Sequence, residues 1–209
     1  MSGTLKARKT STFLDEFGVQ VAINANYYFP FRSNSIFDYY PHEGDAVEVC
    51  GYAASRGNVY SEKKWMPGTL FISERNEASF EEPVGDVYNA IAGNGFLVRD
   101  GAVAGRFEDD RPYPRAGLGL DAGRRRLFFF VIDGKQPNYS EGATLSELAG
   151  VMREYGVHDG IRLDEGGSST IVVREPEGKA RVVNSPINHR LPYFERVVAN
   201  HLGVFAKRR

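Results

Sequence analysis

Residues 161–173 of the chain read IRLDEGGSSTIVV, and here an apolar strand pattern runs without a spacer into acids, glycines and hydroxyl residues. The alternation before Asp164 predicts a strand, so Asp164 and Glu165 are expected at a strand end. A glycine pair lets the backbone approach a ligand closely because no Cβ interferes. The residues that follow the acids are Gly166, Gly167, Ser168, Ser169 and Thr170. The junction is therefore a candidate site, and the alternative is an acidic turn between two strands.

The segment before this junction predicts a strand, a helix and a second strand. Residues 127–132, LFFFVI, form an apolar run that is typical of a strand covered on both faces. A helix is expected after Thr144, which can form a capping box with Glu147, and Gly156 is well placed beyond the helix end. The order strand, helix, strand predicts a right-handed βαβ crossover with two parallel strands.

This crossover is expected to bring two carboxylates to one rim of the sheet. Asp133 ends the first strand in the sequence VIDG, and Asp164 ends the second strand. On neighbouring strands, about 4.8 Å apart, the carboxylates are expected roughly 5 to 10 Å from each other, which overlaps the separations used in glycoside hydrolysis. Aspartates at strand ends also cap helices and turns, so a structural role for the pair stays open.

The rest of the sequence favours strands and hairpins with few helices. A short helix is expected from Thr12 to Gly18, followed by a strand that delivers Asn24 and Asn26 at its C-terminal end. Turns of hairpins are expected at Asp100–Gly101, Ala122–Gly123 and Pro176–Gly178, and a last strand at 195–205. The predicted fold class is α+β (mixed α/β), with a mixed central sheet, a βαβ crossover and β-hairpins.

Length and composition suit one compact domain over residues 1–209, with a loop-rich region at about 30–80. The chain has 209 residues, of which 42% are hydrophobic and 25% charged. The formal net charge is -1, so neither nucleic acid nor an anionic membrane is the expected partner. Cys50 is the single cysteine, which excludes an internal disulfide. No apolar run is long enough to predict a membrane span, and the first residues lack the apolar core of a secretory signal.

Polar and aromatic residues elsewhere add candidates for ligand contacts. Asn24 and Asn26 suit sugar hydroxyls or turn backbone equally well, and Asn94 lies between two glycines at an expected exposed turn. Arg115 stands at the mouth of a strand, where a guanidinium binds phosphate bidentately or forms a structural ion pair. The four histidines lack the paired spacing of a zinc hydrolase, and no metal or cofactor is expected. Aromatic residues of the loop-rich region that suit stacking on a sugar, or ordinary packing, are Tyr39, Tyr40, Tyr60 and Trp65.

A series of motifs occurs in order from about Thr10 to Phe205. The motifs are AINANYYF (22–29), AGNGFLVRDG (92–101), PRAGLGLD (114–121), FFFVIDGKQPNYSEGATLSELAGVM (128–152), IRLDEGGSSTIVV (161–173), NSP (184–186) and ERVVANHLGVF (195–205). Together they resemble the phosphodiester glycosidase family. The resemblance implies hydrolysis of a sugar-1-phosphodiester, such as one of N-acetylglucosamine, at the glycosidic bond, with release of free sugar and a phosphomonoester.

The resemblance also implies a set of site residues, while the individual roles are our hypothesis. We expect Arg115 to hold the phosphate and Asp133 and Asp164 to supply the carboxylate pair. Family members commonly read LDGGGSS, so Glu165 stands in place of a glycine, where its charge would repel a phosphodiester or provide another acid. We expect Asn24, Asn26 and Asn94 to bind the sugar hydroxyls. Family-like positions are Asn24, Asn26, Asn94, Arg115, Asp133, Asp164, Gly166, Gly167, Ser168 and Ser169.

Two other functions stay open on the sequence alone. A non-catalytic carbohydrate-binding protein is suggested by Glu165 and the aromatic loop region. A metal-dependent phosphodiesterase would use Asp133, Asp164 and Glu165 as oxygen ligands for a hard cation. The expected partner of the chain is a sugar-1-phosphodiester or glycan substrate. Relatives are often exported, but the sequence does not indicate a compartment.

Overall fold

The structure is a computed structural model that describes residues 4–35, 38–80, 82–107 and 111–206. Within these residues the chain is predominantly β and has two α-helices, α1 (Thr10–Phe17) and α2 (Leu145–Glu154). A single 3-10 turn, η1 (Gly166–Ser168), belongs to the described residues as well. Neither described α-helix is long and apolar enough to cross a membrane. The expectation of few helices is confirmed.

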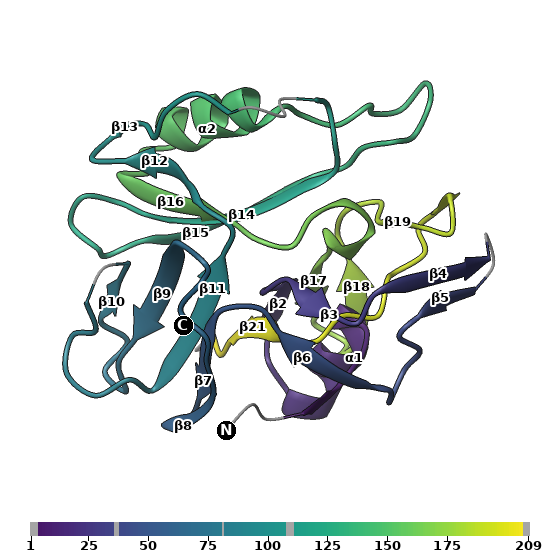
Figure 1. Cartoon of the computed structure of the whole chain (residues 1–209), viewed down its shortest axis with the longest axis horizontal. Helices are drawn as coiled ribbons and strands as arrows, with labels where there is room; N and C mark the ends of the chain where they lie inside the picture. The colour runs from purple at the N-terminus through teal and green to yellow at the C-terminus, as the bar shows by residue number, and fades with distance from the viewer. Residues whose placement is uncertain (1–3, 36–37, 81, 108–110, 207–209) are drawn as a thin grey trace.

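Three larger sheets surround the middle of the molecule (Figure 1). The upper sheet has the strand order β13-β12-β16-β14-β15, and α2 lies above it. Its strands are β12 (Phe96–Arg99), β13 (Ala102–Val103), β14 (Arg115–Leu120), β15 (Leu127–Ile132) and β16 (Asp159–Arg162). A second sheet, ordered β10-β9-β11-β7-β8, contains β7 (Tyr52–Ser55), β8 (Asn58–Glu62), β9 (Gly68–Ile72), β10 (Ala78–Ser79) and β11 (Asn89–Gly93).

The third sheet and three smaller ones complete the described strands. The third sheet, ordered β18-β17-β2-β21, contains β2 (Val21–Asn24), β17 (Ile171–Arg174), β18 (Ala180–Val182) and β21 (His201–Val204). A three-stranded sheet holds β1 (Leu5–Lys6), β6 (Ala46–Val49) and β3 (Tyr28–Phe29). Two pairs remain, β4 (Arg32–Ser35) with β5 (Asp38–Tyr40), and β19 (Ile187–Asn188) with β20 (Leu191–Pro192). The region expected to be rich in loops therefore carries β4 to β10.

The predicted mixed sheet is wrong, because every strand pair among the described residues is antiparallel. β15 and β16 do run in the same direction, but they are not neighbours. Each of them pairs antiparallel with β14, which lies between them. The predicted order of strand, helix and strand is correct, but β14, which precedes both strands in the sequence, lies between β15 and β16 in the sheet. An α+β description holds in the coarse sense, with β structure predominating.

β15 also differs from the expectation of a strand covered on both faces. It is the last strand of its sheet, and all six of its residues are half-buried. The apolar run LFFFVI therefore forms a sheet edge, with alternate side chains packed on α2 and on the central core.

Local signals specified several elements correctly. Thr144 Oγ1 accepts a hydrogen bond from the Glu147 N–H at 3.1 Å, and the complete capping box begins α2. Gly18 ends α1 with a φ of 66°, as glycine allows, although α1 begins at Thr10 rather than Thr12. The three expected hairpins are the antiparallel pairs β12–β13, β14–β15 and β17–β18.

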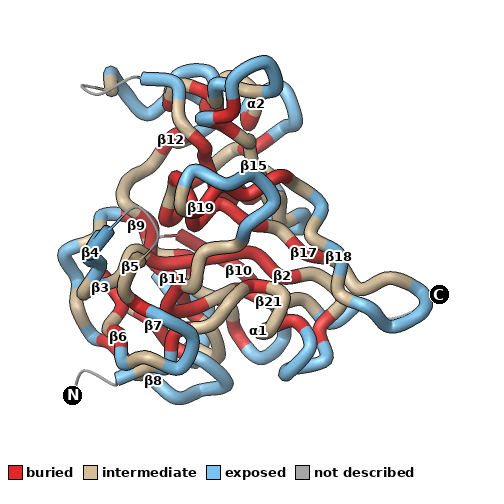
Figure 2. Tube along the Cα trace, turned by 90° about the vertical axis from the view of Figure 1, so that its right-hand side faces the viewer, coloured by how far each residue is buried: buried red, intermediate tan, exposed pale blue. Residues whose placement is uncertain are grey.

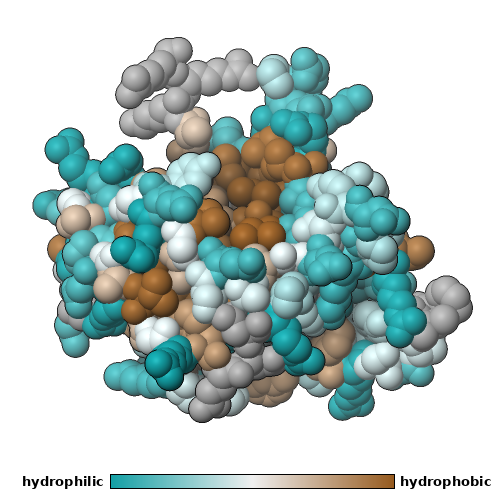
Figure 3. All heavy atoms as spheres, turned by 90° about the horizontal axis from the view of Figure 1, so that it is seen from above, coloured by the Kyte–Doolittle hydropathy of each residue, from teal (hydrophilic) through white to brown (hydrophobic). Residues whose placement is uncertain are grey.

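The main apolar core lies between the upper sheet and the two other large sheets. It includes Leu70, Leu118, Ile161 and Leu163, all without exposed surface. Figure 2 shows the buried segments concentrated around β2, β11 and β17. On the face seen from above Figure 1, hydrophobic residues gather in a hollow bordered by hydrophilic ones (Figure 3). The core thus fixes the strand ends from which the candidate site is built.

Candidate active site

The junction after β16 is held by backbone hydrogen bonds to two separate parts of the chain. The Asp164 N–H donates to the carbonyl of Ala25, directly after β2, and the Gly166 N–H donates to the carbonyl of Pro114, both at 2.9 Å. Gly166 has a φ of 68°, and a Cβ there would lie 2.8 Å from the ring of Tyr113. A Cβ on Gly167 would lie 2.4 Å from the guanidinium of Arg196. The two glycines are therefore required by packing at the junction.

Asp164 is a buried acid whose protonation changes near neutral pH. Its side chain accepts a hydrogen bond from the Glu165 N–H at 3.0 Å. Burial raises its pKa to about 7, although the nearby Ser168 hydroxyl and the charge of Arg196 act in the opposite direction. Ser168 Oγ forms no hydrogen bond of ordinary geometry among the described residues, so its effect reflects proximity. A carboxyl group with this pKa can both give and take a proton at pH 7.

Glu165 and Arg115 form a buried ion pair. Arg115 Nη1 lies 2.7 Å from Glu165 Oε2, and the two side chains are 5% and 9% exposed. The other nitrogens of Arg115 donate to the carbonyls of Ala143 at 2.9 Å and Arg111 at 2.7 Å. Burial raises the pKa of Glu165, whereas the positive charges of Arg115 and Arg162 lower it. The phosphate contact of Arg115 stays a prediction, and its guanidinium is already engaged within the protein.

Asp133 is anchored separately from Asp164. One carboxylate oxygen accepts hydrogen bonds from Asn184 Nδ2 at 2.8 Å and the Ser185 N–H at 2.9 Å. The other accepts from the hydroxyl of Tyr139 at 3.0 Å. Asp133 follows β15 and Asp164 follows β16, and these two strands flank β14. The two strand axes are therefore roughly 10 Å apart, twice the predicted spacing. A catalytic partnership of Asp133 with Asp164 stays a prediction.

Asn184 connects Asp133 to the glycine and serine junction. Its side-chain nitrogen donates to the carbonyl of Ser169 at 3.0 Å as well as to Asp133. Ser169 Oγ and Thr170 Oγ1 are buried and have no hydrogen-bond partner among the described residues. These hydroxyls and Ser168 Oγ are thus polar groups at the junction that the described protein atoms do not satisfy.

Asn24 and Asn26 are built into the scaffold beneath the site. Asn24 donates to the carbonyl of Asp164 at 2.7 Å and accepts from the Thr170 N–H at 3.1 Å, so it braces both ends of the junction. Asn26 donates to the carbonyl of Cys50 at 2.8 Å and accepts from the Ala92 N–H at 3.1 Å. Their contacts with sugar hydroxyls stay predictions, since the amides have structural partners.

Asn94 and Arg162 meet at the turn between β11 and β12. The Asn94 N–H donates to the carbonyl of Arg162 at 3.0 Å, and Arg162 Nε donates to the carbonyl of Asn94. Arg162 is close enough to lower the pKa of Glu165 and of Tyr27. The structure therefore brings Asn94 to the margin of the site through a residue that the sequence did not single out.

Arg196 is the main residue that sequence reasoning missed. Its Nε donates to Asn188 Oδ1 at 3.1 Å, and its positive charge lowers the pKa of Asp164 and of Tyr28. The guanidinium carbon lies 4.7 Å from the centre of the Phe31 ring and 5.7 Å from that of Tyr39. Arg196 occurs within the motif ERVVANHLGVF, but its pattern indicated only a strand.

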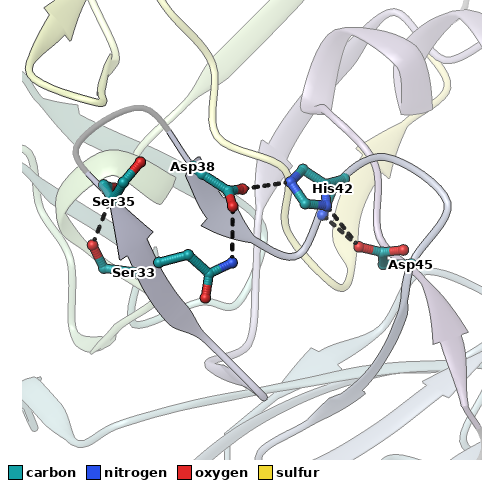
Figure 4. A network of polar contacts seen from close by, with 6 residues as sticks. Ser33, Ser35, Asp38, His42 and Asp45 are labelled. Carbon is teal, nitrogen blue, oxygen red and sulfur yellow. Dashed lines mark hydrogen bonds and ion pairs between the residues drawn. The ribbon is translucent and has the colours of Figure 1, made fainter.

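Aromatic side chains form a wall beside Arg196. Phe31 and Tyr39 belong to the β4–β5 hairpin and its approach, and the Tyr39 ring lies 4.3 Å from that of His189. Figure 4 shows how Asp38 and Asp45 bind opposite nitrogens of His42, at 2.8 and 3.1 Å, and so fasten this hairpin to the next loop. The hydrogen bond to Asp38 is the main cause that raises the pKa of His42.

Among the described residues, one group of acids and a histidine could hold a metal ion, and none of its members belongs to the junction. Ligand atoms of Asp100, His158 and Asp159 lie within 4.8 Å of one another. Asp133, Asp164 and Glu165 form no such group among the described residues. The geometry therefore gives no support to the metal-dependent phosphodiesterase considered above.

Comparison with known proteins identifies the family. The model of the phosphodiester glycosidase family matches residues 17–205. The chain therefore belongs to the phosphodiester glycosidase family. No curated protein sequence gives a significant match.

Solved structures share the fold at low sequence identity. The catalytic domain of zebrafish N-acetylglucosamine-1-phosphodiester alpha-N-acetylglucosaminidase, described as auto-inhibited by its pro-peptide, is 19% identical, with a TM-score of 0.72 over 96% of this chain and 68% of that one. A hypothetical protein from Synechocystis is 13% identical, with a TM-score of 0.69 over 99% of this chain and 55% of that one. A putative exported protein from Burkholderia pseudomallei is 13% identical, with a TM-score of 0.66 over 98% and 69%.

Proposed function

We propose that the chain hydrolyses the glycosidic bond of a sugar-1-phosphodiester and releases a free sugar and a phosphomonoester. The observation that carries this proposal is the buried Asp164, whose pKa is about 7 and which lies within electrostatic reach of Arg196. An acid–base group next to a cation that forms no ion pair among the described residues suits a substrate that carries a phosphate on the bond to be cleaved. Membership of the family supports the same reaction class.

The described contacts suggest a division of roles. Arg115 and Glu165 compensate each other's charge, so Arg196 is the better candidate for the phosphate-binding cation. The Phe31 and Tyr39 rings offer apolar faces to a sugar. Phosphate is already a stabilised leaving group and needs little protonation. The ionised form of Asp164 would therefore activate water, or stabilise the sugar as the bond breaks.

Product analysis in isotopically labelled water tests the reaction class. Purified protein is incubated with an N-acetylglucosamine-1-phosphodiester in water enriched in heavy oxygen. We expect label in the released sugar, because the glycosidic carbon is attacked. Label in the phosphate would instead establish attack on phosphorus, and tight binding without turnover across sugars and phosphodiesters would favour a carbohydrate-binding protein.

Replacement of Arg196 tests the assignment of the phosphate site. Arg196→Gln is expected to raise KM roughly 10- to 100-fold with a smaller change in kcat, since a charge-assisted hydrogen bond contributes about 1.5 to 3 kcal/mol. The matched control is Arg181→Gln, because the Arg181 side chain is 54% exposed and pairs with Glu175 on β18's hairpin. Equal KM values for both variants would contradict the assignment.

A further inference from the structure

A large apolar cavity lies outside the candidate active site. Its volume is about 1280 Å³, and residues of α1, β2, β11, β15 and β21 line it. Representative apolar lining residues are Phe17, Val21, Ile91, Leu127, Phe129 and Leu202. Neither Asp133, Asp164, Glu165 nor Arg196 lines this cavity, so it is a separate feature of the fold.

Two sheet edges that carry no further strand among the described residues border the cavity. β15 and β21 are the last strands of two different sheets, and residues of both strands line the cavity. The Asp121 N–H donates to the carbonyl of Arg126 at the start of the β14–β15 ladder. Because hydrogen-bonded pairs alternate along an antiparallel ladder, the backbone groups of Leu127, Phe129 and Val131 face away from β14. A long apolar edge of this kind is a template for another strand.

The charged residues around the cavity are mostly basic. Lys6, Arg8, Arg56, Arg124 and Arg125 line it, against a single lining acid, Glu74. Arg8 is neutralised by Glu16, but Arg124 and Arg125 stand exposed in the turn that leads into β15. The chain as a whole has a net charge of -1, so this local excess of positive charge is not a general property of its surface.

We propose that the cavity and the β15 edge form a docking site for an extended peptide segment of a partner protein. The segment would add a strand to β15, insert alternate apolar side chains into the cavity and place acidic residues beside Arg124 and Arg125. A peptide fits better than a small molecule for two reasons. The volume exceeds the usual range of about 300 to 1000 Å³ for small-molecule pockets, and free strand edges offer hydrogen bonds that only another backbone satisfies along their length.

Selection from a random peptide library on the immobilised protein tests this proposal. We expect enriched peptides to alternate apolar and other residues and to carry aspartate or glutamate near their ends. Binding of a selected peptide should slow amide hydrogen exchange at Leu127, Phe129 and Val131. The double variant Arg124→Glu/Arg125→Glu changes only exposed turn residues, and it should weaken binding by roughly tenfold or more while glycosidase activity is retained.

Other outcomes would overturn the proposal. Failure to enrich any peptide, or exchange protection confined to other strands, would exclude β15 as the docking edge. Protection of β15 by oleate vesicles but not by peptides would assign the cavity to an amphipathic lipid. Sedimentation of the chain alone as a dimer, with the β15 amides protected, would assign the edge to a second copy. Circular dichroism of the double variant checks that it is folded.

Discussion

Asp164→Asn is expected to reduce the kcat for sugar release by roughly 100- to 10,000-fold, the range that one acid–base group contributes. Asparagine keeps the size of the side chain and the hydrogen bond from the Glu165 N–H, but it neither ionises nor transfers a proton. Release of reducing sugar from an N-acetylglucosamine-1-phosphodiester measures the effect. The free energy of unfolding of Asp164→Asn is measured as well, because an unfolded variant would lose activity whatever the role of Asp164.

The stability of the wild-type protein is expected to fall as pH rises, because Asp164 is buried. In the folded protein the pKa of Asp164 is about 7, whereas the ordinary value is 3.8. The unfolded chain therefore ionises first as pH rises, and the wild-type protein should lose on the order of 4 kcal/mol of stability between pH 4 and pH 8 through this group. Asp164→Asn should lack this loss and be more stable than wild type at pH 8. Chemical unfolding at both pH values gives the comparison.

Asp133→Asn provides the matched comparison for activity. Its carboxylate accepts hydrogen bonds from Asn184, Ser185 and Tyr139, and amide replacement leaves one donor facing the Ser185 N–H. If neither Asp133→Asn nor Asp164→Asn changed turnover, the two carboxylates would have no part in the mechanism. A loss confined to Asp164→Asn would leave Asp133 with a structural role.

Arg115→Ala is expected to lower the free energy of unfolding by about 3 to 5 kcal/mol, because it leaves Glu165 buried without its counter-charge. Glu165→Gln should cost less, since a neutral amide can still accept a hydrogen bond from Arg115. The double variant Arg115→Met/Glu165→Leu should cost less than Arg115→Ala, because both charges disappear together. Its remaining cost reflects the carbonyls of Ala143 and Arg111, which lose their hydrogen-bond donor. Urea unfolding of the three variants measures the coupling between the residues.

The exposed pair of Arg181 and Glu175 supplies the control for this cycle. Their side chains are 54% and 36% exposed, so breaking the pair should change stability by about 1 kcal/mol or less. If Arg115→Ala were no more harmful than Arg181→Ala, the buried pair would not be a stabilising element. Glu165 would then be free to take part in the chemistry, as its place beside Asp164 first suggested.

The separation of the two acids shows where prediction from sequence stopped. The pattern around Asp133 and Asp164 correctly predicted a strand before each acid and a capped helix between them. It could not reveal that β14 lies between those strands, because strand order depends on contacts far apart in the chain. Arg196 was missed for the same reason, because it approaches Asp164 only through the packing of the segment before β21.

The sequence by itself determined the family, the hairpins, the ends of the helices and the glycine-rich junction, because these depend on local backbone preferences and on motifs contiguous in the chain. Tertiary structure alone decided which charges meet. Arg115 is 50 residues from Glu165 in sequence, yet burial brings the two to 2.7 Å and makes their pairing necessary. Burial likewise raises the pKa of Asp164 to about 7, since the low-dielectric surroundings of a carboxyl group are set by residues from many elements.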